Sequence, residues 1–192
     1  MNKCSLSLCT IMLMTVPLAI GQTSTLAPDK AHSEVDFSIV HLGLSKVHGR
    51  FGNIGGSIVL NEADTSKSTV NVTIDVSTVD IGVVVRDNDL KSANFFNVAQ
   101  FPTATFVSTN VARSASGLTV NGNLTLHGVT KPVILEVEAP TGPISGMDKK
   151  PHYGYSAKTT ISRTAFGIGS KVPGAVVGDE VQLTIDLDVA KQ

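Results

Sequence analysis

Cysteine is nearly absent from this sequence of 192 residues, since its two cysteines, Cys4 and Cys9, lie close to the beginning. If residues 1–21 form a cleaved signal peptide, as argued below, the mature chain has no cysteine. Such a chain has no disulfide, no thiolate metal site, no cysteine nucleophile and no haem attached through paired cysteines. Its fold must be stabilised by its own core and hydrogen bonds.

Charged residues are also scarce, and their signs are balanced. The sequence has 15 Lys and Arg against 16 Asp and Glu, which gives a net charge of −1 and a charged fraction of 16%. Proteins typically have ~25% charged residues. This balance excludes nucleic acid as a partner and excludes a polybasic membrane patch. The composition is also unlike that of a disordered tail.

Long apolar runs are absent except at the beginning of the chain. A short positive start at residues 1–3 precedes an apolar stretch without charge at residues 6–20. This pattern predicts a secretory signal peptide over residues 1–21, with cleavage near Gly21/Gln22. An uncleaved membrane anchor is disfavoured, because Pro17 interrupts a run shorter than the ~20 residues that a span needs.

Most of the remaining sequence alternates between apolar and polar residues, as in β-strands with one buried face. The clearest run covers 181–189. Similar alternation predicts strands at 34–39, 70–77, 118–126 and 133–138, with weaker runs at 53–60, 104–109 and 153–161. About eight antiparallel strands are therefore expected. They must cover their apolar faces by closing into a barrel or by folding over as a sandwich.

Two segments depart from this alternation. Residues 86–97 lack it, and Asn88 or Asp89 could cap a short helix there. Residues 22–28 are predicted to be a flexible N-terminal tail.

Several motifs, in order along the chain, resemble those of the YceI-like family. They cover residues 29–37 (DKAHSEVDF), 40–43 (VHLG), 47–51 (VHGRF), 78–80 (TVD), 86–96 (RDNDLKSANFF), 101–106 (FPTATF), 122–133 (GNLTLHGVTKPV), 162–168 (SRTAFGI) and 181–185 (VQLTI). One departure is Asn94, which stands where the family pattern leads us to expect an acidic residue.

The resemblance implies an all-β fold: an elongated, eight-stranded antiparallel, lipocalin-like barrel over residues 29–190, with one short helical segment. It also implies a bacterial periplasmic binding or carrier protein, without enzymatic activity or cofactor, that holds a polyisoprenoid or similar lipid chain. The oligomeric state stays open, because an exposed barrel seam could pair two copies as a homodimer.

The candidate ligand-binding residues are mostly inward-facing apolar side chains of the predicted strands. Two polar candidates join them: His41, which shares the parity of Phe37, and Arg86, which could face a lipid head group. Phe166 could line a tunnel mouth or close the core. The complete set is Phe37, Ile39, His41, Val72, Ile74, Arg86, Phe106, Leu124, Leu126, Phe166, Leu183 and Ile185.

The spacing of His41 and His48 disfavours a metal site formed by these two histidines. His41 and His48 are separated by an odd number of residues, which places them on opposite faces of a regular strand. A two-histidine site on one strand needs an even separation.

Two alternative functions stay open at this point. One is a lipid-modifying enzyme in which His41, Arg86 and Asp87 act at the barrel mouth. The other is an envelope-stress protein whose barrel is filled by its own side chains, for which a core without cavities would be the structural sign.

Overall fold

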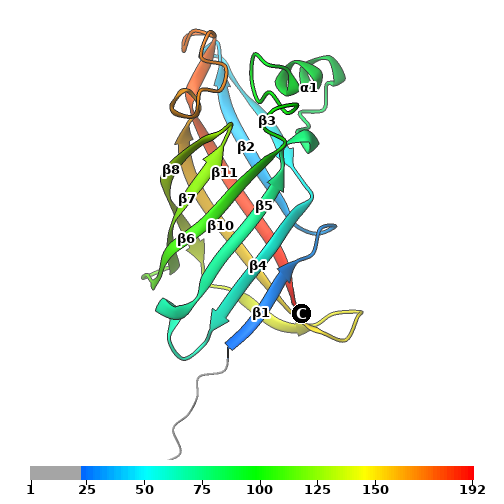
Figure 1. Ribbon diagram of the computed structural model, residues 1–192, viewed down its shortest axis with the longest axis vertical. Helices are drawn as coiled ribbons and strands as arrows, with labels where there is room; N and C mark the ends of the chain where they lie inside the picture. Colours follow the sequence, from blue (N-terminus) through cyan, green and yellow to red (C-terminus); the bar gives the residue numbers. More distant parts are fainter. Residues whose placement is uncertain (1–22) are drawn as a thin grey trace, which may run out of the picture.

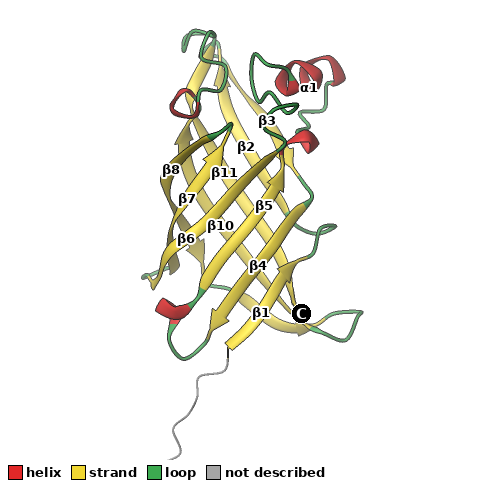
Figure 2. Cartoon of the chain, viewed as in Figure 1, coloured by secondary structure: helices red, strands yellow, loops and turns green. Residues whose placement is uncertain are grey.

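The computed structural model describes residues 23–192, so the predicted signal peptide lies outside the described residues. Strands make up most of the described chain (Figures 1 and 2). They are β1 (Thr23–Pro28), β2 (Glu34–His41), β3 (Ser45–Phe51), β4 (Ile54–Asn61), β5 (Thr69–Asp75), β6 (Thr103–Arg113), β7 (Gly117–Leu126), β8 (Val129–Glu138), β9 (Thr141–Ser145), β10 (Pro151–Ser162) and β11 (Val177–Lys191). The helices are η1 (Thr65–Lys67), η2 (Val76–Thr78), α1 (Val84–Lys91) and η3 (Thr164–Phe166).

The strands close into an elongated antiparallel barrel with eight positions around its wall. β1 and β2 share one position, because both pair with β11, and β3 and β4 share the next, because they pair with β2 and β1. The wall continues through β5, β6, β7, β8 and β10, and the pairing of β10 with β11 closes it. The predicted eight-stranded barrel is therefore confirmed.

The alternating residues of the predicted strands divide between the interior and the outer surface. On β7, the inward residues Val120, Gly122, Leu124 and Leu126 are buried, whereas Asn121, Asn123 and Thr125, which alternate with them, are more exposed. The short strand β9 was not predicted, because all five of its residues are exposed and show no alternation. It extends the sheet beyond the edge of β10.

The predicted flexible tail is wrong for residues 23–28, which form strand β1. This strand pairs with β4 on one side and with β11 on the other. Its inward residues are Ser24, Leu26 and Pro28, and Leu26 is fully buried. The segment resembles a tail in sequence because Leu26 is the one large apolar side chain among its six residues.

The helical segment exists, but its limits and cap differ from the prediction. α1 spans Val84–Lys91, and its N-cap is Val83, which makes no side-chain capping hydrogen bond. Asp87 stabilises the turn before the helix, because its carboxylate accepts a hydrogen bond of 2.8 Å from the backbone N–H of Ile81. None of the helices within residues 23–192 has the length and apolar character required to cross a bilayer.

Gly122 provides a place in the wall for an aromatic ring. It lies on β7 and faces the barrel interior. A Cβ at this position would come within 2.7 Å of both the ring of Phe106 and the carbonyl oxygen of Val107. We expect Gly122→Val to lower the free energy of unfolding by about 2 kcal/mol, because Phe106 must leave its rotamer. Urea unfolding measures this loss. A variant as stable as the wild type would show that the ring moves freely.

Candidate ligand-binding cavity

The barrel interior holds two apolar cavities, one beyond the other along its long axis. The upper cavity, at the α1 end, has a volume of about 130 Å³. Its lining comes from β2, β3, β5, β6, β7, β10 and β11, from η2, from the segment around α1 and from the residues around η3. It includes Phe37, Ile39, Phe51, Leu90, Phe95, Phe96, Leu126, Arg163 and Val181.

The lower cavity also has a volume of about 130 Å³. Its lining includes Ile58, Val72, Phe106, Val120, Leu135, Tyr155, Ile185 and Leu187. Four side chains line both cavities: Val35, Ile74, Leu124 and Leu183. These four form the partition between the cavities.

Phenylalanine rings close the upper end of the interior. Phe51 stacks between Phe37, at a centroid distance of 5.5 Å, and Phe96, at 5.4 Å with perpendicular planes. Phe95 lies against Gly169, so the segment after α1 meets the loop between η3 and β11. Leu90, Phe95 and Phe96 are partly exposed. The upper closure is therefore accessible from solvent.

Arg163 organises the loop that covers this end. Its side chain is 3% exposed. The guanidinium donates five hydrogen bonds of 2.6–3.0 Å, all to backbone carbonyl oxygens, which belong to Ile168, Gly169, Val172, Val177 and Gly178. One buried side chain therefore fixes both ends of this loop, and it also lines the upper cavity.

The lower end is closed more firmly. Leu26 and Val189 are both fully buried, and Ile58 packs with them in a small cluster. Leu60, Tyr155 and Leu187 surround that cluster and also line the lower cavity. The upper end is therefore the easier place for an apolar chain to enter the barrel, because fewer fully buried side chains close it.

Nine of the twelve candidate residues line these cavities. They are Phe37, Ile39, Val72, Ile74, Phe106, Leu124, Leu126, Leu183 and Ile185. Phe166 instead belongs to the core, since it is 2% exposed and its carbonyl oxygen lies 3.1 Å from the Nδ1 of His127.

The two polar candidates lie outside both cavities. His41 and Arg86 line a separate open groove at the upper rim, together with Lys46 and His48. His41 is the last residue of β2, two positions beyond Ile39, so it lies past the part of the strand that lines the upper cavity.

Several cavity-lining residues were missed in the sequence. Val35 and Val181 could have been found, because they share the strand parity of Phe37 and Leu183. Phe95 and Phe96 were interpreted as anchors for the helical segment, and they also line the upper cavity. No sequence signal identifies Arg163, since its partners are backbone carbonyl groups.

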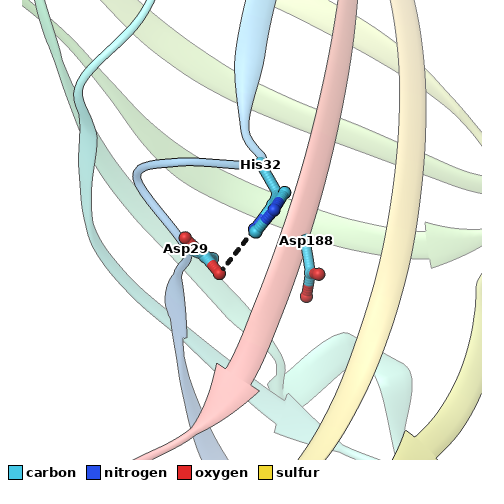
Figure 3. Close-up of side chains that lie close together, drawn as sticks. All are labelled: Asp29, His32 and Asp188. Carbon is cyan, nitrogen blue, oxygen red and sulfur yellow. Dashed lines mark hydrogen bonds and ion pairs between the residues drawn. The ribbon is translucent and has the colours of Figure 1, made fainter. Parts of the chain in front are cut away.

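A groove of about 740 Å³ lies at the lower end, outside the interior, and its lining includes several charged side chains. There the Nδ1 of His32 lies 2.9 Å from a carboxylate oxygen of Asp29, and the Nδ1 of His152 lies 2.7 Å from Asp188. Asp29, His32 and Asp188 offer ligand atoms within 4.8 Å of one another (Figure 3). This group has the spacing for a metal ion, and each member already has a side-chain partner in the chain: Asp29 and His32 contact each other, and Asp188 contacts His152.

These contacts raise the pKa values of both histidines. The hydrogen bond to Asp29 raises the pKa of His32 above its ordinary value of 6.5, and the hydrogen bond to Asp188 does the same for His152. In return, His32 lowers the pKa of Asp29. Each histidine therefore stabilises the fold most when it is protonated.

The sign of this shift predicts how stability changes with pH. A raised folded-state pKa gives stability that is complete below the unfolded pKa and is lost as pH rises through the folded pKa. We therefore expect Tm to fall as pH rises from about 6.5, the ordinary pKa of histidine, through the higher pKa values of the folded state. In His32→Gln/His152→Gln the decline should be smaller. Calorimetric scans of both proteins measure it, and equal declines would contradict the assignment.

Comparison with known proteins identifies the family of this chain. The YceI-like domain matches residues 27–189, and Protein YceI of Salmonella arizonae is 36% identical over 185 residues, 94% of this chain and 93% of that protein. Burkholderia cenocepacia BcnA superposes with a TM-score of 0.71 at 25% identity, over 84% of this chain and 98% of BcnA. A polyisoprenoid binding domain from Saccharophagus degradans shares the fold, with a TM-score of 0.64 at 18% identity over 89% of this chain and all of that domain. The chain belongs to the YceI-like family, as its sequence motifs predict.

Proposed function

We propose that this protein is a periplasmic carrier that holds a polyisoprenoid or similar lipid chain inside its barrel, without catalysing a reaction. The observation that carries the proposal is the pair of apolar cavities, which follow one another along the barrel axis. A domain of the same fold from Saccharophagus degradans is described as polyisoprenoid binding. The predicted signal peptide over residues 1–21 supports export.

The size of each cavity defines what must move when a long chain binds. An apolar cavity of ~150 Å³ holds one benzene molecule, so each cavity of about 130 Å³ suits a group of similar size, close to one isoprene unit. A longer chain therefore needs the partition residues, Val35, Ile74, Leu124 and Leu183, to rotate aside. It also needs Leu90, Phe95 and Phe96 to open the upper end.

Burial of the chain provides the affinity. Each methylene removed from water contributes about 0.8 kcal/mol, so ten carbons contribute roughly 8 kcal/mol before losses. The costs of association and of ordering the chain reduce this figure. Such affinity depends on apolar area, which explains why few polar residues face the interior.

Thermal unfolding with added geranylgeraniol tests the proposal. A ligand at about one hundred times its Kd stabilises the folded state by about 2.7 kcal/mol, which corresponds to a rise in Tm of roughly 5–10 °C for a domain of this size. The variant His41→Ala should show the same rise, because His41 lies outside the cavities. The absence of a rise with any isoprenoid alcohol would contradict the proposal.

The two alternatives receive less support from the geometry. A self-filled barrel would have a core without cavities, and this interior has two. For the enzyme alternative, His41 and Arg86 do share the rim groove. The carboxylate of Asp87, however, is engaged by the backbone N–H of Ile81.

A further inference from the structure

Exposed apolar side chains gather at the upper end of the barrel. Within residues 23–192, eleven large apolar side chains are exposed, and seven of them lie at this end. We call these seven the apolar rim: Val40, Leu42, Leu44, Val83, Val84, Val85 and Val176. Three are strongly exposed, namely Leu44 at 85%, Val84 at 73% and Val85 at 79%. A concentration of this kind marks an interaction surface.

The apolar rim comes from three segments that meet in space. The β2–β3 turn contacts the loop before β11, since the backbone N–H of Leu42 donates to the carbonyl of Val176 at 2.9 Å. The beginning of α1 faces the same turn across the rim groove, which Arg86 and Ser45 both line. Figure 1 shows α1 at the same end as the upper parts of β2 and β3.

The turn itself contains a leucine in a conformation that leucine disfavours. Leu42 and Gly43 have φ values of 53° and 65°, as in a type I′ hairpin turn, where asparagine, aspartate or glycine is preferred. Leu42 is half exposed, so burial within the chain does not explain why leucine occupies this position. Contact with an apolar partner outside the chain would explain it.

Positive charge lies beside the apolar rim. Lys46 and Arg86 are exposed and line the groove between its two halves. Within residues 23–192, neither side chain forms an ion pair with a carboxylate. Lys46 donates a hydrogen bond of 3.2 Å to the side chain of neutral Gln182, so its charge is not neutralised. A surface that lies in the interface of an anionic membrane has this composition of exposed apolar residues next to cations.

The apolar rim also borders the closure of the upper cavity. Ile39 lines that cavity next to Val40, Val177 lines it next to Val176, and Leu90 lines it from α1. A membrane in contact with the rim would therefore face the place where a lipid chain can enter.

We propose that the apolar rim docks on an anionic membrane surface, with Leu44, Val84 and Val85 among the acyl chains and with Lys46 and Arg86 against lipid phosphates. This inference rests on the proposed carrier function, because it supplies the route by which a lipid chain passes between bilayer and barrel. The docked protein would hold its long axis steeply to the membrane, with the His32 and His152 groove pointing away.

Sedimentation with vesicles tests the docking. The wild type should bind vesicles of phosphatidylcholine and phosphatidylglycerol more strongly than vesicles of phosphatidylcholine alone. In Leu44→Ser/Val84→Ser/Val85→Ser, binding to both should fall about ten-fold or more, since the apolar contact is lost. Lys46→Gln/Arg86→Gln should weaken binding only to the anionic vesicles.

The matched control is Ile144→Ser/Met147→Ser, which removes two exposed apolar side chains from the lower end. It should bind vesicles like the wild type. Equal loss in this control, or unchanged binding in the rim variant, would overturn the proposal. So would a dimer in sedimentation equilibrium that the rim variant abolishes, because a second copy would then cover the rim.

Geranylgeraniol stabilisation separates this inference from the proposed function. The rim variant should keep the rise in Tm, because its cavities are unchanged. If the wild type binds vesicles and shows no rise in Tm, the carrier function fails and the docking stands. If the rise occurs and the wild type ignores vesicles, the docking alone fails.

Discussion

Replacing Arg163 by methionine is expected to lower the free energy of unfolding by about 4 kcal/mol. Methionine keeps much of the length of the side chain and removes all five hydrogen bonds to the loop between η3 and β11. Buried carbonyl groups without a donor each cost about 1–3 kcal/mol, and some of them regain water when the loop opens. For a domain of this size, the loss corresponds to a fall in Tm of roughly 10 °C.

The matched control for this prediction is Arg50→Met. Arg50 also faces more than one partner, Glu34 at 3.8 Å and Asp80 at 3.4 Å, and its side chain is 60% exposed. Exposed ion pairs contribute about 1 kcal/mol or less, so this variant should unfold close to the wild type in urea. If Arg163→Met cost no more than Arg50→Met, the loop would not depend on the buried guanidinium.

Replacing Ile74 by tryptophan is expected to weaken isoprenoid binding by at least about ten-fold. Ile74 lines both cavities, so a larger ring system at this position occupies the path between them. Excluding one isoprene unit, five carbons, removes roughly 4 kcal/mol of gross burial energy. Each 1.4 kcal/mol is a factor of ten in Kd. The expected loss of affinity is therefore well above ten-fold, even if the remaining carbons of the chain regain part of the lost burial energy elsewhere.

Thr73→Trp is the matched control, because Thr73 is the adjacent residue of β5 and points to the opposite face. The wild type has no tryptophan, so indole fluorescence reports on each variant separately. Titration with geranylgeraniol should change the tryptophan emission of Thr73→Trp only slightly. In thermal-shift measurements, this variant should have the same Kd for geranylgeraniol as the wild type. Equal affinities of the two variants would mean that the chain does not pass between the cavities.

The sequence predicted the parts of the fold whose two faces differ in chemistry. β11 was predicted because its apolar and polar residues alternate over 181–189, and the apolar residues Leu183, Ile185 and Leu187 line the lower cavity. β1 was missed because its inward set combines Leu26 with Ser24 and Pro28. Its position is determined by pairing with β4 and β11, which are distant in the sequence.

The residues of the candidate site also differ in whether the sequence pattern could identify them. Strand parity identified nine cavity-lining residues, because inward apolar side chains of a closed barrel face one another. It did not show where along β2 the cavity ends, so it included His41, which lies at the end of the strand beyond the cavity lining. It also could not identify Arg163, whose role depends on backbone carbonyls gathered by the loop. The apolar rim was likewise hidden, because Leu44 and Val84 are far apart in the sequence and their exposure follows only from the fold.

The most direct test of the carrier function is mass spectrometry of the mature protein, purified from its native source without detergent. The protein is measured first in its native state and then after extraction with organic solvent. We expect one long isoprenoid or similar lipid per chain, which leaves only on denaturation and is much reduced in Ile74→Trp. A protein that is empty, and that also takes up no added polyprenyl compound, would contradict it.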